Sequence, residues 1–299
     1  MLSASRFTRP SWTIKPTEVK NIDLSKNVHF DLKLNNLVKE IIKNKQKFIL
    51  NYGNEYNLYK SICKYYNLDI NNVAIGYGAS DILQRIIFSL SVKKLYIVNN
   101  PFAMIKIYCK MINLDYELIS LRDLKKKKIK KDSAMYIANP NGFDGLCSNI
   151  SNITNKFKIA IIDEVYADFF SKFSLLNKPQ TNLIIVKSLS KSLGVAGLRV
   201  GFSYSSSKIT KEIQKLRTSQ VTSSIASIVV PEIIHHTKDV ILRMKKAQIF
   251  LEQTYECLNT NTNYVLFKKQ NKYTDKFGSR KIGSYYRMAL ADLKTLRTA

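Results

Sequence analysis

The chain has 299 residues, 45% of them hydrophobic, and a formal net charge of +26. This length allows a large buried core and suits one large domain with a smaller lobe. The first residues, MLSASRFTRPSW, lack the uninterrupted apolar segment of a secretory signal, and no later apolar run approaches the roughly 18 residues that a membrane span requires. We therefore expect a globular, cytoplasmic protein without membrane segments.

The four cysteines are far apart in the sequence. They form no C-x-x-C pair, and no histidines stand near them, as the ligand sets of zinc sites require. We expect reduced, mostly buried thiols and no metal site. The residues are Cys63, Cys109, Cys147 and Cys257.

The positive charge could indicate a nucleic-acid partner, an anionic surface, a phosphorylated ligand or only a lysine-rich composition. The lysines are scattered over the whole chain beside many Asn and Ile, and the only dense run is KKKKIKK at 125–131. That distribution favours compositional bias with a solvated loop over a dedicated anion-binding surface. Because no arginine-glycine tract, zinc-finger spacing or RNP-like motif occurs, we do not expect a nucleic-acid partner.

Between about residues 55 and 205, the hydrophobic pattern alternates between helices and short β-branched strands. Strands that are apolar on both faces and separated by helices predict an α/β fold with a mainly parallel sheet covered on both sides. The lack of a linker predicts interwoven lobes, with a large domain at 40–215 and a small α+β lobe built from 1–39 and 216–299. In chain order, we expect helices at 57–66 and 79–90, a strand at 95–98, a helix at 102–113, and strands at 116–119, 134–138, 158–162 and 183–187.

The carboxyl ends of these strands matter most, because ligands of such sheets bind beyond them. The segment Ser188-Leu189-Ser190-Lys191 directly follows the strand at 183–187, and GVAGLRVGF with Arg199 comes next. The hydroxyls and the guanidinium could hold a phosphate, and the glycines allow close backbone approach. A buried lysine is costly unless paired or used. The residues alone leave two roles open for Lys191. It could form a covalent bond to a ligand, or its amine could merely extend to solvent.

Three other segments lie at strand ends or before a helix. Asp163, at the end of IAIID, could bind a metal, cap a helix or pair with a protonated ring nitrogen, and capping is the simplest of these. Residues 76–81 (GYGASD) open the expected helix at 79–90 as a phosphate seat, although Ser80 or Asp81 could merely cap that helix. The segment NPNGFDG at 139–145 is by itself a turn.

Taken in order, these segments resemble the class I/II aminotransferases of pyridoxal-phosphate (PLP) fold type I, especially the histidinol-phosphate aminotransferase branch. The family's lysine segment reads approximately S-x-S-K-x-x-x-x-x-G-x-R-x-G, which residues 188–201 match at every fixed position. IAIIDEVYADF likewise resembles the family's D-E-A-Y-x-D-F. The resemblance covers roughly residues 50–205 and implies that the chain binds PLP in a fold with a mainly parallel sheet.

The resemblance implies a role for each matching residue. Lys191 would hold the cofactor as a Schiff base and move a proton from the substrate's Cα. Asp163 would pair with the pyridine nitrogen, and Tyr166 would donate a hydrogen bond to the phenolic oxygen. The groups that would bind the phosphate are the side chains of Ser188, Ser190 and Arg199 and the backbone N–H groups of Ala79 and Ser80.

Other positions match the family less closely. Tyr52 resembles the tyrosine that this branch sends into its partner's cofactor site, which implies a homodimer. Phe102 is the candidate for the ring-stacking aromatic residue. Gly142 stands where the family has an asparagine that contacts the phenolic oxygen, so either Asn141 substitutes for it or the contact is lost.

The C-terminal part resembles the family's small lobe at NYVLF (263–267) and YYRMA (285–289). Arg287 is our first candidate for binding the substrate carboxylate and Arg280 the second, whereas a surface arginine on a short strand is the alternative for Arg287. The chain is also shorter than is usual for the family, and the shortening falls partly in this lobe, where substrate specificity is normally set.

We therefore expect a PLP-dependent aminotransferase that acts on a small amino acid or amino-phosphate ester, with a keto acid as second substrate. A decarboxylase of the threonine-phosphate type is the alternative, because the same cofactor residues serve both reactions. A basic nucleic-acid-binding protein on a reused fold and a non-catalytic PLP binder are further alternatives.

Overall fold

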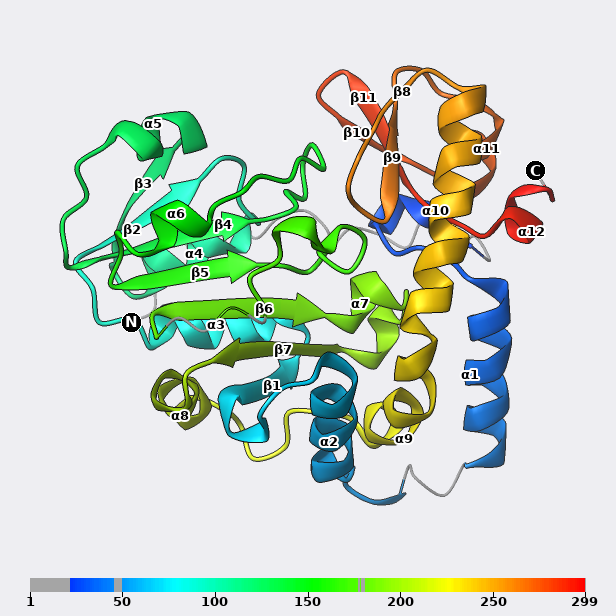
Figure 1. The fold of residues 1–299 in the computed structure, drawn as a ribbon. Coiled ribbons are helices and arrows are strands. Elements are labelled where there is room, and N and C mark those ends of the chain that lie inside the picture. Colours follow the sequence, from blue (N-terminus) through cyan, green and yellow to red (C-terminus); the bar gives the residue numbers. More distant parts are fainter. Residues whose placement is uncertain (1–21, 46–49, 177, 179–180, 299) are drawn as a thin grey trace, which may run out of the picture.

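The computed structural model describes residues 22–45, 50–176, 178 and 181–298. Within these ranges, one sheet has seven strands: β1 (Val73–Tyr77), β2 (Lys94–Val98), β3 (Asp115–Ile119), β4 (Ser133–Ala138), β5 (Ile159–Asp163), β6 (Leu183–Ser188) and β7 (Val200–Ser205). Their order across the sheet is β1-β7-β6-β5-β4-β2-β3 (Figure 1). Strands β2 to β6 are parallel, whereas β7 is antiparallel to both β1 and β6.

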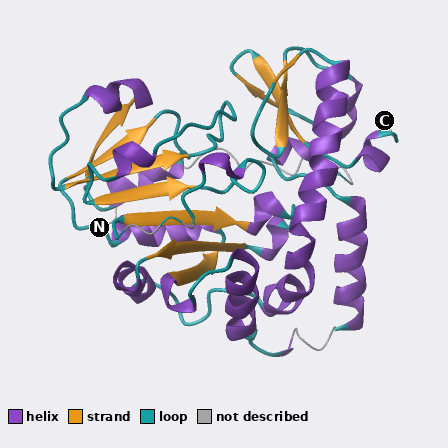
Figure 2. Cartoon of the chain, viewed as in Figure 1, coloured by secondary structure: helices purple, strands orange, loops and turns teal. Residues whose placement is uncertain are grey.

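Helices cover both faces of this sheet (Figure 2). They are α2 (Glu55–Tyr66), α3 (Ala79–Phe88), α4 (Met104–Met111), α5 (Leu121–Lys126), α6 (Ser151–Thr154), α7 (Leu189–Ser192) and α8 (Ser207–Lys215). The strands are apolar on both faces because alternate side chains enter different cores. In β4, Tyr136 packs in the cluster that contains Ile82 of α3, whereas Ile137 packs in the opposite cluster with Phe157.

A second, antiparallel sheet lies at the side toward which the arrows of β5 and β6 point (Figure 1). Its strands are β8 (Cys257–Leu258), β9 (Tyr264–Phe267), β10 (Arg280–Ile282) and β11 (Tyr285–Ala289), in the order β10-β11-β9-β8. The remaining helices are α1 (Leu32–Asn44), α9 (Ser224–Ile233), α10 (Thr237–Thr254), α11 (Lys272–Phe277) and α12 (Leu293–Leu296). One apolar cluster joins both sheets, since it contains Val73 of β1, Met244 of α10 and Met288 of β11.

The segment before α1 is tied to the end of the chain. Phe30 forms a parallel bridge with Ala291, and its N–H donates to the Leu290 carbonyl at 2.9 Å. Asp31 then caps α1 by accepting from the Leu34 N–H at 2.8 Å, and it pairs with Arg243 of α10 at 2.6 Å. These contacts hold residues 22–31 beside the small sheet, close to the carboxyl ends of β5 and β6.

The predicted α/β class is confirmed, and every helix or strand expected between residues 57 and 187 overlaps an observed one. Strands β1 and β7 were not expected, since their short apolar runs lie beside the glycine-rich segments. The lobe division at 40–215 stays a prediction, and residues 1–21 of the expected small lobe lie outside the described residues. No helix in the described residues is long and apolar enough to cross a membrane.

Candidate active site

Lys191 lies in α7, immediately after β6, and its amine faces the N-terminal segment. The Nζ atom donates to the backbone carbonyl of Asn27 at 2.6 Å and lies 5.9 Å from the ring centroid of Tyr166. Burial, together with the positive charges of Arg287 and Arg199, lowers the pKa of Lys191 to about 8. A part of the amine is therefore neutral near neutral pH, as a lysine that accepts protons or forms covalent bonds requires.

Asp163 is the last residue of β5, the strand next to β6, and it is buried. Its carboxylate accepts from the Tyr136 hydroxyl at 2.8 Å and from the Val165 N–H at 3.3 Å. Burial raises the pKa of Asp163 to about 6, and the Tyr136 hydrogen bond opposes that rise. No helix follows Asp163 before residue 170, so it does not cap one. Among the described residues, no group of three His, Cys, Asp or Glu could hold a metal.

Tyr166 follows β5 in a tight turn and is buried, with 7% of its surface exposed. Its hydroxyl accepts a hydrogen bond from the side-chain amide of Asn27 at 2.6 Å. Its ring meets the Tyr264 ring edge to face, at a centroid distance of 6.0 Å. Burial raises the pKa of the Tyr166 hydroxyl to about 12, so it remains protonated and can donate a hydrogen bond.

The start of α3 forms a cradle for an anion. No side chain caps this helix, so the N–H groups of its first turn are free of a capping partner, and Asp81 turns its carboxylate to Arg85 instead. Gly78 has a φ of 80°, and a Cβ there would lie 2.5 Å from Nη2 of Arg199. A Cβ at Gly201 would lie 2.3 Å from the Ala79 nitrogen. Both glycines are therefore needed for the close approach of Arg199 and β7 to this helix end.

The side chains expected around this cradle lie on neighbouring elements. Arg199, at a left-handed φ of 54°, stacks over the Tyr77 ring with its guanidinium carbon 5.4 Å from the centroid. Ser188 and Ser190 are buried beside it, and the Ser188 hydroxyl accepts from the Ser190 N–H at 3.3 Å. Ser80 is in the first turn of α3, so its N–H has no intrahelical acceptor, whereas its carbonyl accepts from the Tyr108 hydroxyl at 3.3 Å.

The small sheet supplies arginines to the other side of the site. Arg287 of β11 is half-buried, donates to the Gly142 carbonyl at 3.5 Å and lies over the Tyr264 ring at 5.5 Å. Its Nε is buried and has no partner among the described residues. Arg280 of β10 is the cross-strand partner of Arg287 and is exposed.

Gly142, which departs from the family motif, and its neighbour Asn141 are both explained by contacts in their surroundings. A Cβ at Gly142 would lie 3.2 Å from Cε2 of Tyr166, so a larger residue would press on that ring. Both ends of the Asn141 amide bind the backbone, because it donates to the Asn100 carbonyl at 3.1 Å and accepts from the Phe143 N–H at 2.8 Å. Asn141 thus shapes the turn.

Two other candidates lie at the edge of this group. Phe102 is half-buried, and its backbone contacts the hydroxyl of Tyr136, the residue that binds Asp163. Tyr52 lies in the loop before α2 and is 87% exposed. Among the described residues, it makes no hydrogen bond or ring contact with the rest of the site.

Sequence analysis did not anticipate Asn27, Asn263, Tyr136 or Tyr264. Asn27 meets Lys191 across 164 positions of sequence, and Asn263 donates to the same Asn27 carbonyl at 3.3 Å across 236 positions. Nothing local marks such pairs. Tyr136 reads as one more apolar residue of a buried strand, and only the position of Asp163 on the neighbouring strand gives its hydroxyl a partner.

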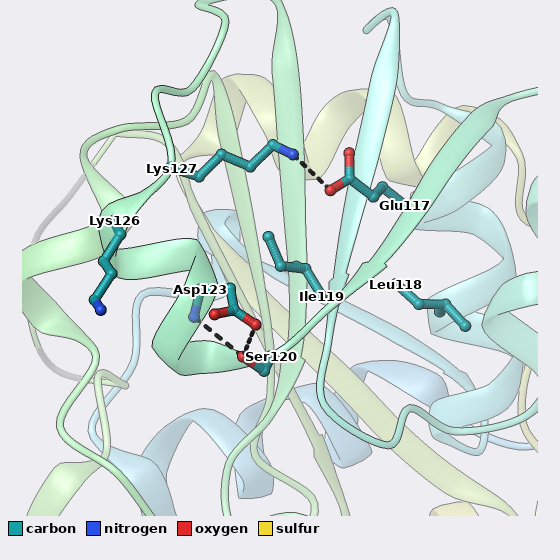
Figure 3. A pocket seen from close by; sticks show the side chains of 7 residues that line it. All are labelled: Glu117, Leu118, Ile119, Ser120, Asp123, Lys126 and Lys127. Atoms are coloured by element: carbon teal, nitrogen blue, oxygen red, sulfur yellow. Dashed lines mark hydrogen bonds and ion pairs between the residues drawn. The ribbon is translucent and has the colours of Figure 1, made fainter.

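The lysine run at 125–131 lies far from these residues. It begins at the end of α5 and borders a surface hollow beside β3, the outermost strand, which β4 and β2 separate from β5 (Figure 3). Lys127 pairs with Glu117 at 2.7 Å, and Asp123 accepts from the Ser120 hydroxyl at 2.6 Å in the same hollow. Because carboxylates and lysines alternate there, the hollow is not an anion site.

Comparison with known proteins agrees with this arrangement. The family described as aminotransferase class I and II matches residues 19–266. The chain is 28% identical over 246 residues to the histidinol-phosphate aminotransferase of Brachyspira hyodysenteriae, covering 74% of this chain and 70% of that one.

Two solved structures share the fold. The histidinol-phosphate aminotransferase of Sinorhizobium meliloti, in complex with pyridoxal-5'-phosphate, has a TM-score of 0.73 at 16% identity and covers 93% of this chain and 88% of its own. The L-threonine-O-3-phosphate decarboxylase of Porphyromonas gingivalis has a TM-score of 0.69 at 16% identity, with 90% and 96% covered. The chain belongs to the class I and II aminotransferases, and it is a PLP-dependent enzyme.

Proposed function

We propose that this aminotransferase uses Lys191 to hold its cofactor and transfers the amino group of a small amino acid or amino-phosphate ester to a keto acid. The observation that carries the assignment is the pairing of adjacent strand ends. Buried Asp163 ends β5, and Lys191, with a pKa of about 8, follows β6 directly. A lysine and an aspartate with pKa values moved toward neutrality at one sheet edge are typical of a catalytic site.

The residues present fit PLP. The uncapped start of α3 and the close approach that Gly78 and Gly201 allow suit a phosphate group. Buried Asp163 suits a cationic ring nitrogen, since a carboxylate beside such a nitrogen favours its protonated form. We assign the phosphate to Ala79, Ser80, Ser188, Ser190 and Arg199, the ring nitrogen to Asp163, the phenolic oxygen to Tyr166, and the ring face to Phe102.

When bound, PLP supplies an electron sink that makes the bonds to the substrate's Cα breakable. The protein's part is to hold charges and to move a proton. Asp163 keeps its negative charge at neutral pH because Tyr136 and the Val165 N–H donate to it. Lys191 is the proton carrier, because its lowered pKa leaves neutral amine available at the pH where the enzyme works.

We assign the substrate's carboxylate to Arg287, whose half-buried guanidinium reaches the Gly142 carbonyl beside Tyr166. Arg280 stands opposite Arg287 across the β10–β11 pair and is exposed, so it suits a second anionic group farther from the cofactor. A phosphate ester at the far end of the substrate would complete this arrangement. We therefore favour an amino-phosphate ester over an unphosphorylated amino acid.

We also propose a homodimer in which Tyr52 enters the partner's site. The loop before α2 and the first turn of α2 expose Leu50 by 84%, Tyr52 by 87% and Tyr56 by 62%. Large apolar side chains gathered in this way are typical of a surface that another chain covers. A cytoplasmic location is proposed as well, because all four cysteines are free thiols, which suits a reducing compartment.

The test is the visible spectrum of the purified protein with PLP, followed while amino donors are added singly with a keto acid. Threonine phosphate and threonine form a matched pair, because both carry the carboxylate assigned to Arg287 and only one carries the phosphate. Histidinol phosphate and histidinol form a second pair, which lacks the carboxylate and tests the phosphate alone. We expect the cofactor band to bleach with a phosphorylated donor and the keto acid to be consumed in equal amount. Absence of any cofactor band would defeat the proposal. Carbon dioxide release without keto-acid consumption would instead identify decarboxylation.

A further inference from the structure

Among the described residues, Asn27 is the one that hydrogen-bonds to both Lys191 and Tyr166. It follows the 3-10 helix Leu24–Lys26, has a left-handed φ of 58°, and is 5% exposed. Its backbone carbonyl accepts from Lys191 Nζ at 2.6 Å, and its side-chain Nδ2 donates to the Tyr166 hydroxyl at 2.6 Å. The chain's N-terminal segment thus holds the two groups that would lie on either side of the cofactor's reactive end.

This position is fixed from outside the site. Asn263 donates to the Asn27 carbonyl at 3.3 Å, and the bridge between Phe30 and Ala291 lies three residues further along. Before Asn27, Asp23 begins the 3-10 helix by accepting from the Ser25 N–H at 3.0 Å. The backbone of Asn27 is therefore held by the small lobe, and the hydrogen bond to Tyr166 orients its side-chain amide.

The Tyr166 hydroxyl has one proton to donate, and its oxygen can accept from others. Since it accepts from Asn27, its own proton is directed elsewhere, and it donates to no other group in the described part of the chain. A hydroxyl that accepts a hydrogen bond also becomes a better donor, because successive hydrogen bonds polarise one another. The Asn27 amide therefore both aims and strengthens the donor group of Tyr166.

Position 142 offers no such amide. Gly142 has no side chain, and a Cβ there would lie 3.2 Å from Tyr166 Cε2 and 3.6 Å from its hydroxyl oxygen. The nearby Asn141 amide is occupied by the backbone at both ends. Asn27 is thus the amide that is placed to act at this corner of the site.

We propose that Asn27 is a positioning residue, whose side-chain amide directs the Tyr166 hydroxyl toward the cofactor's phenolic oxygen while its carbonyl holds Lys191. This inference rests on the proposed roles of Lys191 and Tyr166. It assigns the function of the missing amide at 142 to a residue 115 positions earlier in the chain.

The variants Asn27→Asp and Asn27→Gly test the amide alone, because both residues tolerate a left-handed φ and both keep the backbone carbonyl for Lys191. Asn67→Asp and Asn67→Gly are matched controls, since Asn67 ends α2 at a φ of 55° and is exposed. Melting curves of all four check that the chain remains folded. Tyr166→Phe shows which tyrosine signal belongs to Tyr166, because that signal disappears. Because it removes the hydroxyl itself, it also gives the largest change that loss of the Asn27 hydrogen bond could cause in the bound cofactor.

The first readout needs no cofactor. In protein with ¹³Cζ-labelled tyrosine, we expect the Tyr166 signal at pH 7 to move in Asn27→Gly and in Asn27→Asp, because the hydrogen bond from the amide to the hydroxyl is lost, and to stay in place in both Asn67 variants. The second readout is the pH at which the visible band of the bound cofactor changes. This pH should rise in both Asn27 variants, by no more than it rises in Tyr166→Phe. In the double variant, Asn27→Gly should cause no rise beyond that of Tyr166→Phe alone.

The outcomes separate the two proposals. A Tyr166 signal that is unchanged in Asn27→Gly and Asn27→Asp overturns the positioning role, even if the protein binds PLP. A shifted Tyr166 signal in a protein that forms no cofactor band supports the contact and defeats the proposed function instead.

Discussion

On the large-sheet side of the site, Asp163 and Lys191 follow neighbouring strands, and each is held by short hydrogen bonds, at 2.8 Å from Tyr136 and at 2.6 Å to Asn27. On the small-sheet side, Arg280 is exposed and the buried Nε of Arg287 has no partner in the described part of the chain. Asp163 and Lys191 thus already have hydrogen-bond partners within the protein, whereas the buried Nε of Arg287 keeps an unused donor. We infer that the large-sheet side fixes the chemistry and the small-sheet side selects the substrate, so changes on the two sides should have different kinetic effects.

The largest effect is expected for Lys191→Ala. Without the amine, the covalent link to the cofactor and the proton carrier are both lost, and kcat should fall by at least about 1,000-fold. The visible band of the bound cofactor should change as well. Lys211→Ala, at an exposed position of α8, is the control and should match the unmodified enzyme. Retention of the band and of a normal kcat in Lys191→Ala would move the site elsewhere.

Asp163→Asn should separate activity from stability. It removes the carboxylate that holds a ring proton, so kcat should fall on the order of 100-fold or more. In protein without cofactor, however, it should raise the free energy of unfolding at pH 7 by about 1 to 2 kcal/mol, because a buried charge disappears.

The sign of the pH dependence follows from the raised pKa. The pKa of Asp163 is about 6 in the folded chain and has its ordinary value of 3.8 when the chain is unfolded, so the native state binds the extra proton between these values. The unmodified protein should lose stability as pH rises through this window. Asp163→Asn should lack that loss, and denaturant melts at pH 4 and pH 7 measure it. Equal pH dependence of the two proteins would contradict the burial assigned to Asp163.

On the small-sheet side, Arg287→Ala should raise KM for the amino donor by about 10- to 100-fold with a smaller change in kcat, because a charged hydrogen bond to the substrate is lost. Arg280→Ala should raise KM less, and only for the phosphorylated member of a donor pair. Steady-state kinetics with phosphorylated and unphosphorylated donors distinguish the two arginines. If Arg280→Ala raised KM equally for phosphorylated and unphosphorylated donors, Arg280 would not bind the phosphate.

The same contrast explains what the sequence could predict. Lys191 and Asp163 each stand at or just after the end of a recognisable strand, and Arg199 has a fixed place in the motif that begins at Ser188, so local pattern and motif spacing are sufficient to identify them as candidates. Asn27 gives no such signal, because its role arises only when residues 164 positions apart meet. The antiparallel direction of β7 was also hidden, since strand polarity depends on the path of the chain and leaves no mark in a five- or six-residue apolar run.

Tyr136 provides the smallest and most specific test of the large-sheet side. Tyr136→Phe removes one hydroxyl and leaves the ring in its core, so the fold should persist. Because that hydroxyl lowers the pKa of Asp163, its loss should raise the pKa further above 6, and the acidic limb of the kcat profile should move to higher pH by about one unit. KM for the donor should stay nearly unchanged, since Tyr136 is buried behind Asp163.

Tyr96→Phe is the matched control, because Tyr96 is also a buried strand tyrosine but packs in the cluster on the opposite face of the sheet. It should leave the pH profile in place. If both variants move the acidic limb equally, the shift reflects general loosening of the core. If only Tyr136→Phe moves the acidic limb, Tyr136 controls the charge on Asp163 from behind it. The difference between the two sides of the site then includes residues that touch neither cofactor nor substrate.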